Sequence, residues 1–316
     1  MSLHPLLATA AALQGGPFTT AQALDAGYEE REITRLVRSA EWTRLRRGVL
    51  IESTAIPDDE ADRTIIRLRA LALVTTDTVV ASHQTAAILH GVTLLRPAGD
   101  LLEVTRSSRG AGRVEAGVHW HCAALPAGHL TSINGVCSTT CARTVIDNAR
   151  HGDFASGLVI AESALNKGLT SLEELRAVHE LCLDWPGARN AGRVASFAST
   201  LSESVGESLA RIAFDAHGLP SPEQQVLIRD RAGIIARADF LWRDKRTIGE
   251  FDGRVKYDEL AADGMQTLYD EKRREDRLRA AGFEVVRFGW SDILGRPAWV
   301  AACVRAAFAR SARLPR

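Results

Sequence analysis

Three carboxylates, Asp239, Glu250 and Asp252, stand in a stretch that otherwise has the pattern of a β-hairpin, residues 237–257. A turn at Asp244–Lys245 places Asp239 opposite Glu250. Cβ atoms of such cross-strand partners lie about 5 Å apart, and like charges directly opposite each other destabilise a sheet. A hard cation that takes oxygen ligands offsets this repulsion. The spacing therefore predicts a Mg²⁺ or Mn²⁺ site held by Asp239 and Glu250, with Asp252 as a candidate third ligand.

Neighbouring residues supply the other parts of a hydrolytic site. Mg²⁺ usually binds through one or two carboxylates and the phosphate oxygens of a substrate, and it activates water. Glu207, on an expected helix upstream, is a candidate to orient that water. Lys256 or Lys272 is a candidate to stabilise the developing negative charge. The alternative is a hairpin whose charged face lies in solvent, with Arg237 neutralising Asp252.

The composition is that of an ordinary globular protein. The 316 residues are 46% hydrophobic and 25% charged, which allows two or three domains with real cores. A formal net charge of zero excludes a uniformly basic coat for nucleic acid, although a local basic patch remains compatible with it. The five cysteines contain no C-x-x-C pair, which favours a reduced, cytoplasmic setting without structural zinc.

No apolar run reaches the ~18 residues of a membrane span. The apolar N-terminal stretch LLATAAALQGG resembles the central region of a signal peptide but lacks the positive segment before it. We therefore expect a folded helix over residues 4–13 and a protein without a membrane partner.

Residues 1–55 have the pattern of a winged helix-turn-helix. Thr19 or Thr20 is suited to cap a short helix that ends at Gly27, and a second helix is expected over residues 29–40. A basic hairpin follows it. Clustered arginines on the second helix and the hairpin hold phosphates in DNA-binding proteins. The candidate DNA-binding residues are Arg31, Arg35, Arg38, Arg44, Arg46 and Arg47.

The interleaved glutamates of the second helix leave open a simple solvated surface. Residues 56–195 are expected to form a mixed α/β domain that contains several histidines. His119 and His121 point to one face of an expected strand, so a metal site is conceivable there. Packed or hydrogen-bonded structural histidines are the more common case.

The third module, residues 196–316, has the expected order helix, three strands, helix, strand. This order and the acidic residues resemble the PD-(D/E)XK restriction-endonuclease-like superfamily, in particular its very-short-patch-repair-like branch. The resemblance implies a metal-dependent nuclease in which Asp239, Glu250 and Glu207 take the acidic roles. It covers residues 200–295, and Asp252 occupies the position of the family lysine.

The N-terminal stretch GPFTTAQALDAGYEEREITRLVRSAEWTRLRRGVL is similar to the winged-helix module of type IV, abortive-infection-type antitoxins. The segments ASHQTAAILHG and CSTTCARTVIDNAR resemble the middle region of actinobacterial relatives. This resemblance implies DNA binding, regulation of an operon and a nucleotidyltransferase-like toxin as partner. The expected fold is thus an α+β and α/β multidomain chain with a winged helix, a mixed middle region and an endonuclease-like core.

Two functions follow from these expectations. The first is a DNA-binding protein with Mg²⁺-dependent deoxyribonuclease activity, in repair or in defence. The second is a non-catalytic antitoxin and repressor that binds its own operator.

Overall fold

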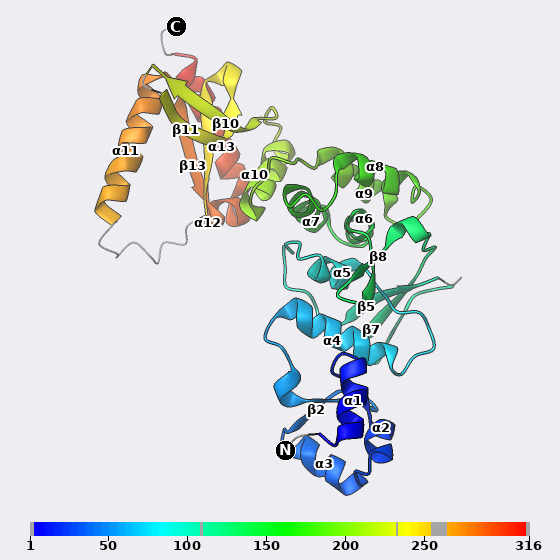
Figure 1. The fold of residues 1–316 in the computed structure, drawn as a ribbon. Helices are drawn as coiled ribbons and strands as arrows, with labels where there is room; N and C mark the ends of the chain where they lie inside the picture. The colour runs from blue at the N-terminus through cyan, green and yellow to red at the C-terminus, as the bar shows by residue number, and fades with distance from the viewer. Residues whose placement is uncertain (1–2, 108–109, 232, 254–263, 314–316) are drawn as a thin grey trace. The chain divides into compact units, whose positions relative to one another are not determined.

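The computed structural model describes residues 3–107, 110–231, 233–253 and 264–313, with side chains left undescribed over 264–271. The chain divides into two compact units, residues 1–197 and 198–316 (Figure 1). The first unit contains the segments expected as modules 1–55 and 56–195. In the part of the chain that the structure describes, no helix is long and apolar enough to cross a membrane.

The N-terminal segment has the elements expected of a winged helix. They are α1 (Pro5–Leu13), β1 (Phe18–Thr19), α2 (Thr20–Asp25), α3 (Glu30–Arg38), β2 (Trp42–Arg46) and β3 (Val49–Glu52). The strands form one sheet in the order β1-β3-β2. Thr19 caps α2 in a capping box with Gln22, which confirms one of the two expected caps. Ile33, Leu36 and Trp42 are buried in the core of this segment.

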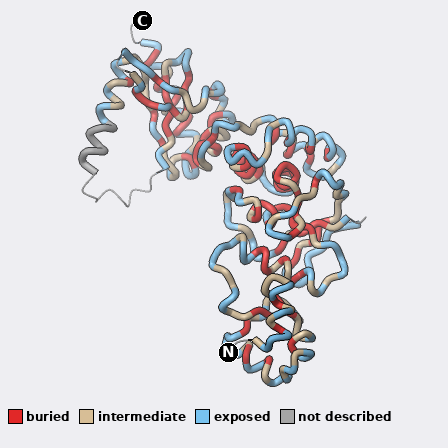
Figure 2. Tube along the Cα trace, viewed as in Figure 1, coloured by how far each residue is buried: buried red, intermediate tan, exposed pale blue. Residues whose placement is uncertain are grey.

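The middle segment places a mixed sheet against helices. Its elements are η1 (Ser53–Ala55), α4 (Glu60–Ala72), β4 (Val80–Ala81), α5 (His83–Leu89), β5 (Leu102–Arg106), β6 (Arg113–Glu115), β7 (Val118–Cys122), η2 (Ala127–His129), β8 (Leu130–Ile133), β9 (Val136–Thr139), α6 (Cys141–His151), α7 (Phe154–Asn166), α8 (Leu172–Glu180) and α9 (Ala188–Phe197). The strand order is β6-β7-β5-β4-β9-β8. Residues of α4, α5 and the strands form one apolar core. Figure 2 marks the buried positions of the chain in red.

The second unit is a four-stranded sheet with helices on both faces. Its elements are α10 (Val205–Ala216), β10 (Glu223–Asp230), β11 (Gly233–Trp242), η3 (Arg243–Lys245), β12 (Thr247–Asp252), α11 (Gly264–Ala280), β13 (Glu284–Gly289), α12 (Trp290–Gly295) and α13 (Pro297–Ser311). The strand order is β10-β11-β12-β13, with β12 and β13 parallel. The predicted order of helix, three strands, helix and strand is present.

The hairpin register agrees with the register expected from the turn. Leu241 pairs with Ile248, and Phe240 pairs with Gly249. Leu241 and Ile248 are buried together with Leu278 of α11 in one core. Because side chains alternate across a strand, Asp239 and Glu250 belong to this same α11-covered face of the sheet.

Candidate functional sites

Helix α3 presents basic residues to solvent. Arg31, Arg35 and Arg38 are exposed, whereas Ile33 and Leu36 of the same helix are buried. This division follows from the 3.6-residue period of the helix. Three of the predicted DNA-binding arginines therefore lie on one solvent-exposed surface of α3.

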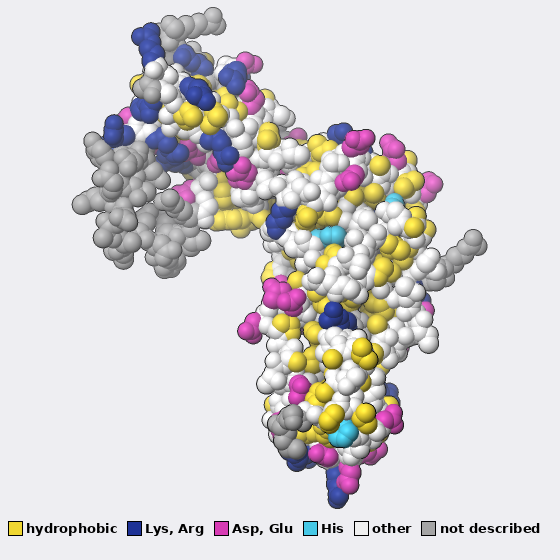
Figure 3. All heavy atoms as spheres, viewed as in Figure 1, with side chains coloured by type: hydrophobic (Ala, Val, Ile, Leu, Met, Phe, Trp, Pro, Cys, Tyr) yellow, Lys and Arg dark blue, Asp and Glu magenta, His cyan; other side chains and the backbone are white. Residues whose placement is uncertain are grey.

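Two of these arginines are engaged by carboxylates. Arg31 Nε lies 2.5 Å from Glu29 Oε2, and Arg35 Nη1 lies 3.2 Å from Glu41 Oε1. Exposed ion pairs of this kind contribute little energy and are readily exchanged for another anion. Figure 3 shows Lys and Arg side chains mixed with Asp and Glu side chains in the N-terminal segment. These glutamates partly neutralise the positive charge of α3.

The β2–β3 hairpin, which we call the wing, carries arginines with fewer carboxylate partners than those of α3. Arg44 and Arg47 are exposed, and Arg47 precedes Gly48, whose φ of 78° makes the turn between β2 and β3. Arg46 is half-buried at a register shift of the hairpin, and burial lowers its pKa. Within the described ranges, no carboxylate is ion-paired with Arg44, Arg47 or Arg38. Such exposed guanidinium groups are suited to phosphate contacts.

The second unit brings the three predicted metal ligands to one cavity of about 260 Å³. Asp239, Glu250 and Asp252 all line it. Three arginines share the lining: Arg237, Arg274 and Arg287. Lys256 lies outside the described residues, and Lys272 is exposed on α11. The cavity therefore mixes oxygen donors with guanidinium groups.

Glu250 is buried and paired with two cations. Its Oε2 lies 3.2 Å from Arg274 Nη2 and 3.1 Å from Arg287 Nε. The parallel pairing of β12 with β13 sets Arg287 beside Glu250. The Oε1 atom of Glu250 is buried without a hydrogen-bond partner among the described residues. One oxygen is therefore available to a ligand, and the other is already neutralised.

Glu207 is held in place at the start of α10. Ser204 caps this helix, and its hydroxyl donates to Glu207 Oε1 at 2.7 Å. Glu207 Oε2 accepts from the backbone N–H of Glu203 at 3.0 Å and from Gln225 Nε2 at 2.9 Å. Glu207 is thus buried and fixed by neutral donors, with no cation among these partners.

Asp239 lies close enough to Glu207 to feel its charge. Burial raises the pKa of Asp239, and the charge of Glu207 raises it further. The backbone N–H of Phe251 donates to Asp239 Oδ2 at 2.9 Å and acts in the opposite direction. A carboxyl with a raised pKa in a cavity is a frequent property of functional sites, although structural networks show it too.

The alternative, in which the charged face of the hairpin lies in solvent, does not hold for Glu250, which is buried, whereas Asp252 is exposed. Arg237 forms its ion pair with Glu203 on the preceding segment. The oxygen donors suit a divalent cation, but the cation has to compete with the guanidinium groups of Arg274 and Arg287. Sequence reasoning missed these two arginines. The only available signal was the basic character of the helix and strand that follow the hairpin.

Comparison with known proteins gives a match at the N-terminus. Residues 5–51 match the family described as "Transcriptional regulator, AbiEi antitoxin". This match supports the prediction of a winged-helix, antitoxin-like segment, in agreement with the folded elements α1 to β3. The restriction-endonuclease-like identity of the third module remains a prediction.

The chain is also similar to proteins of Mycobacterium tuberculosis. It is 29% identical over 173 residues to the uncharacterized proteins MT2308, of strain CDC 1551, and Rv2248, of strain H37Rv. The match covers 55% of this chain and only 62% of each of those proteins. The crystal structure of the Mycobacterium tuberculosis protein RV2827C matches with a TM-score of 0.41 and 16% identity, over 60% of this chain and 74% of that one.

Proposed function

We propose that this protein is a DNA-binding transcriptional regulator of the antitoxin type. The observation that carries the proposal is the winged-helix segment whose residues 5–51 match the antitoxin regulator family. Its exposed arginines lie on α3, which is the second helix of the helix-turn-helix, and on the wing. Modules of this type use these two elements for DNA contact.

The wing supplies most of the phosphate affinity in this proposal. Arg44 and Arg47 are exposed and carry no carboxylate partner in the described part of the chain. Arg38, in the last turn of α3, is a further exposed arginine. Each phosphate neutralised by an arginine releases condensed counterions, so the affinity falls steeply with salt. We further propose, from the family resemblance, that a nucleotidyltransferase-like toxin is the protein partner.

The test is binding of the full chain to DNA from its own operon, measured by fluorescence anisotropy at several salt concentrations. We expect Arg44→Ala and Arg47→Ala each to weaken binding and to reduce the slope of log K against log salt by about 1. Arg113→Ala, which removes an exposed arginine of β6 that is paired with Glu115, is the matched control. Affinity and salt slope unchanged in both wing variants would contradict the proposal.

A second candidate function is metal-dependent hydrolysis of phosphodiesters by the second unit. The observation in its favour is that Asp239 shares a cavity with Glu250 and has a pKa raised by burial and by Glu207. Against it stand the two arginines on Glu250. Asp239 and the free Oε1 of Glu250 would hold Mg²⁺ or Mn²⁺, which would polarise a phosphate and activate water.

This candidate is tested by incubating single- and double-stranded DNA with the protein and either Mg²⁺ or Mn²⁺. Cleavage that is lost in Asp239→Asn and retained in Asp244→Asn, an exposed turn variant, would support it. Absence of cleavage with both metals, together with operator binding, would leave the non-catalytic regulator as the function.

A further inference from the structure

Four histidines and a glutamate converge in the middle segment, far along the sequence from one another. The possible ligand atoms of His83, His121 and His151 all lie within 4.8 Å of one another. Those of Glu103, His119 and His121 satisfy the same condition. We call these five residues the histidine cluster. His121 belongs to both groups and joins them.

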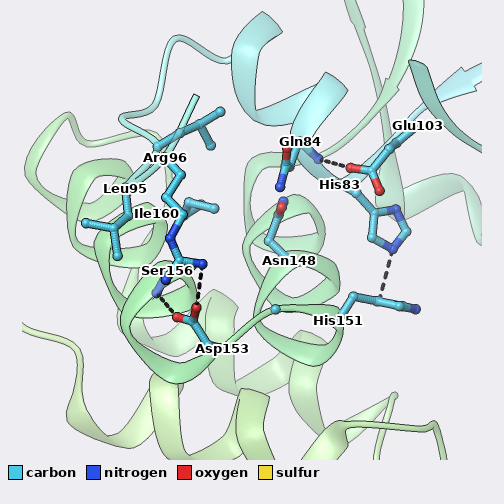
Figure 4. A pocket seen from close by; sticks show the side chains of 12 residues that line it. His83, Gln84, Leu95, Arg96, Glu103, Asn148, His151, Asp153, Ser156 and Ile160 are labelled. Carbon is cyan, nitrogen blue, oxygen red and sulfur yellow. Dashed lines mark hydrogen bonds and ion pairs between the residues drawn. The ribbon is translucent and has the colours of Figure 1, made fainter. Parts of the chain in front are cut away.

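The fold assembles the histidine cluster from four elements. His83 begins α5 and His151 ends α6, while parallel pairing of β5 and β7 sets His119 beside Glu103. The ring centroids of His83 and His121 are 3.6 Å apart, and those of His83 and His151 are 4.6 Å apart. In Figure 4 the ring of His83 points toward His151, with Glu103 beside it.

Hydrogen bonds determine which ring nitrogens carry protons. The carbonyl of Asp147 is only an acceptor, so His151 Nδ1, 3.0 Å away, donates to it. That same N–H faces His83 Nε2 at 3.1 Å, so His83 Nε2 is the unprotonated nitrogen. His83 Nδ1 then donates to Ser82 Oγ at 2.9 Å. Outer hydrogen bonds of this kind orient the imidazoles of metal sites.

His121 follows the same pattern. Its Nε2 lies 3.4 Å from Glu103 Oε1, which leaves Nδ1 for a ligand. Glu103 is itself oriented by the backbone N–H of Gln84, which donates to Oε2 at 2.8 Å. His121 and His151 thus each have one nitrogen bound to an outer partner and one lone pair that remains available. The lone pair of His83 Nε2 points toward His151, and an ion bound there would replace this hydrogen bond.

The cluster includes one strained backbone position and borders a cavity. His83 has a φ of 50°, a left-handed conformation that a non-glycine residue seldom adopts. A cavity of about 550 Å³, lined by His83, His121 and other residues, gives a ligand access.

We propose that the histidine cluster is a Zn²⁺ site in which His83, His121 and His151 are the ligands, Glu103 orients His121 from outside the coordination shell, and the fourth position is open. Three imidazole nitrogens with an open fourth position form a donor set that suits tetrahedral zinc. Mg²⁺ prefers oxygen ligands and does not fit. The ion would tie α5 and α6 to the sheet strand β7.

The experiment uses the full chain, stripped of metal with a chelator and titrated with Zn²⁺ against a chromophoric competitor. We expect about one Zn²⁺ per chain, with Co²⁺ giving the visible absorption of a tetrahedral site. His121→Ala and His151→Ala should each weaken Zn²⁺ binding by at least about 10-fold. Far-UV circular dichroism of both variants checks that the fold is kept.

Two controls separate this site from other zinc ligands on the chain. His217→Ala removes a histidine of the second unit, and Asp239→Asn alters the carboxylate cavity. Both should bind Zn²⁺ as the unsubstituted chain does. A folded chain that takes up no Zn²⁺ would overturn the proposal, and so would His121→Ala and His151→Ala variants that bind Zn²⁺ as tightly as the unsubstituted chain. Loss of binding in Asp239→Asn would do the same by moving the site.

Discussion

At the scale of single residues, Asp239 is a carboxylate whose negative charge is unfavourable in its cavity. Its carboxyl is partly buried and feels the charge of Glu207, so its pKa in the folded state lies above the ordinary value. For such a group, stability declines as the pH rises through the interval between the ordinary and the raised pKa. At neutral pH the charged Asp239 therefore opposes folding of its own unit.

We predict that Asp239→Asn stabilises the protein at pH 7 by about 0.5–2 kcal/mol, the usual gain from removing an unfavourable functional group. Asparagine can still accept the hydrogen bond from the Phe251 N–H. The gain should vanish at about pH 3, where the wild-type carboxyl is protonated in both states. Urea unfolding in the presence of a chelator at both pH values measures it.

Asp244→Asn is the control for this prediction, because Asp244 is exposed in the turn at η3. It should change the free energy of unfolding by no more than about 0.5 kcal/mol. Equal stabilisation by both substitutions would indicate a general charge effect. Destabilisation by Asp239→Asn at pH 7 would show that the charged carboxylate does not oppose folding.

Helix α6 contains a buried ion pair, and here the removal of one charged side chain should destabilise the protein. Arg143 Nε lies 2.7 Å from Asp147 Oδ2, and each side chain is only 1% exposed. The guanidinium also stacks over the ring of Trp185, with its carbon 4.5 Å from the centroid. A buried pair adds little compared with apolar residues, but breaking it leaves an uncompensated buried charge.

We predict that Arg143→Ala lowers the free energy of unfolding of the first unit by about 3–5 kcal/mol. Arg113→Ala, at an exposed site of the same unit, should have an effect below about 0.5 kcal/mol. Denaturant unfolding followed by circular dichroism measures both. A loss of less than about 1 kcal/mol for Arg143→Ala would show that Arg150, 2.9 Å from Asp147, compensates alone.

At the scale of elements, a glycine sets how closely α10 approaches the sheet. A Cβ on Gly206 would lie 2.0 Å from Cζ of Phe251 on β12. We predict that Gly206→Ala destabilises the second unit by about 1–3 kcal/mol through overpacking. Gly295→Ala in α12 meets no atom within 4 Å and should be close to neutral. Thermal unfolding of the two variants tests the difference.

Local patterns were sufficient to predict most elements and one register. The turn after Trp242 and the alternation of apolar residues define the β11–β12 pairing, and Thr19 caps α2 because its hydroxyl reaches the third residue on. Pairing between distant segments was not predictable in this way. Arg287 lies beside Glu250 only because β13 pairs with β12 in parallel. The spacing of residues along the sequence does not predict this pairing.

The histidine cluster illustrates the same limit. Alternation placed His119 and His121 on one face of a strand, and the possibility of a metal site followed from that. The helices that bring His83 and His151 to this face were expected as helices, but their docking onto the sheet was not. Tertiary packing therefore decides the composition of the site, whereas sequence patterns decide only its parts.

At the scale of the whole molecule, each unit contains its own apolar core. The second unit buries Phe214, Phe240 and Phe288 among its helices and sheet. The first unit has separate cores in its winged-helix and middle segments. Units that each have their own core commonly unfold in separate cooperative transitions. A single melting temperature then describes neither unit.

We therefore predict two calorimetric transitions for the full chain, each assignable by one substitution. Arg143→Ala should lower the temperature of one transition, and Gly206→Ala should lower the temperature of the other. Because the two sites share no partner, their combined effect on stability should equal the sum within about 0.3–0.5 kcal/mol. Zn²⁺ should raise only the transition that Arg143→Ala lowers, because a ligand of the folded state stabilises the unit that binds it. A single transition that responds to both substitutions would instead mean that the two cores unfold as one cooperative unit, and the assignment of zinc to the first unit would then depend on the ligand variants alone.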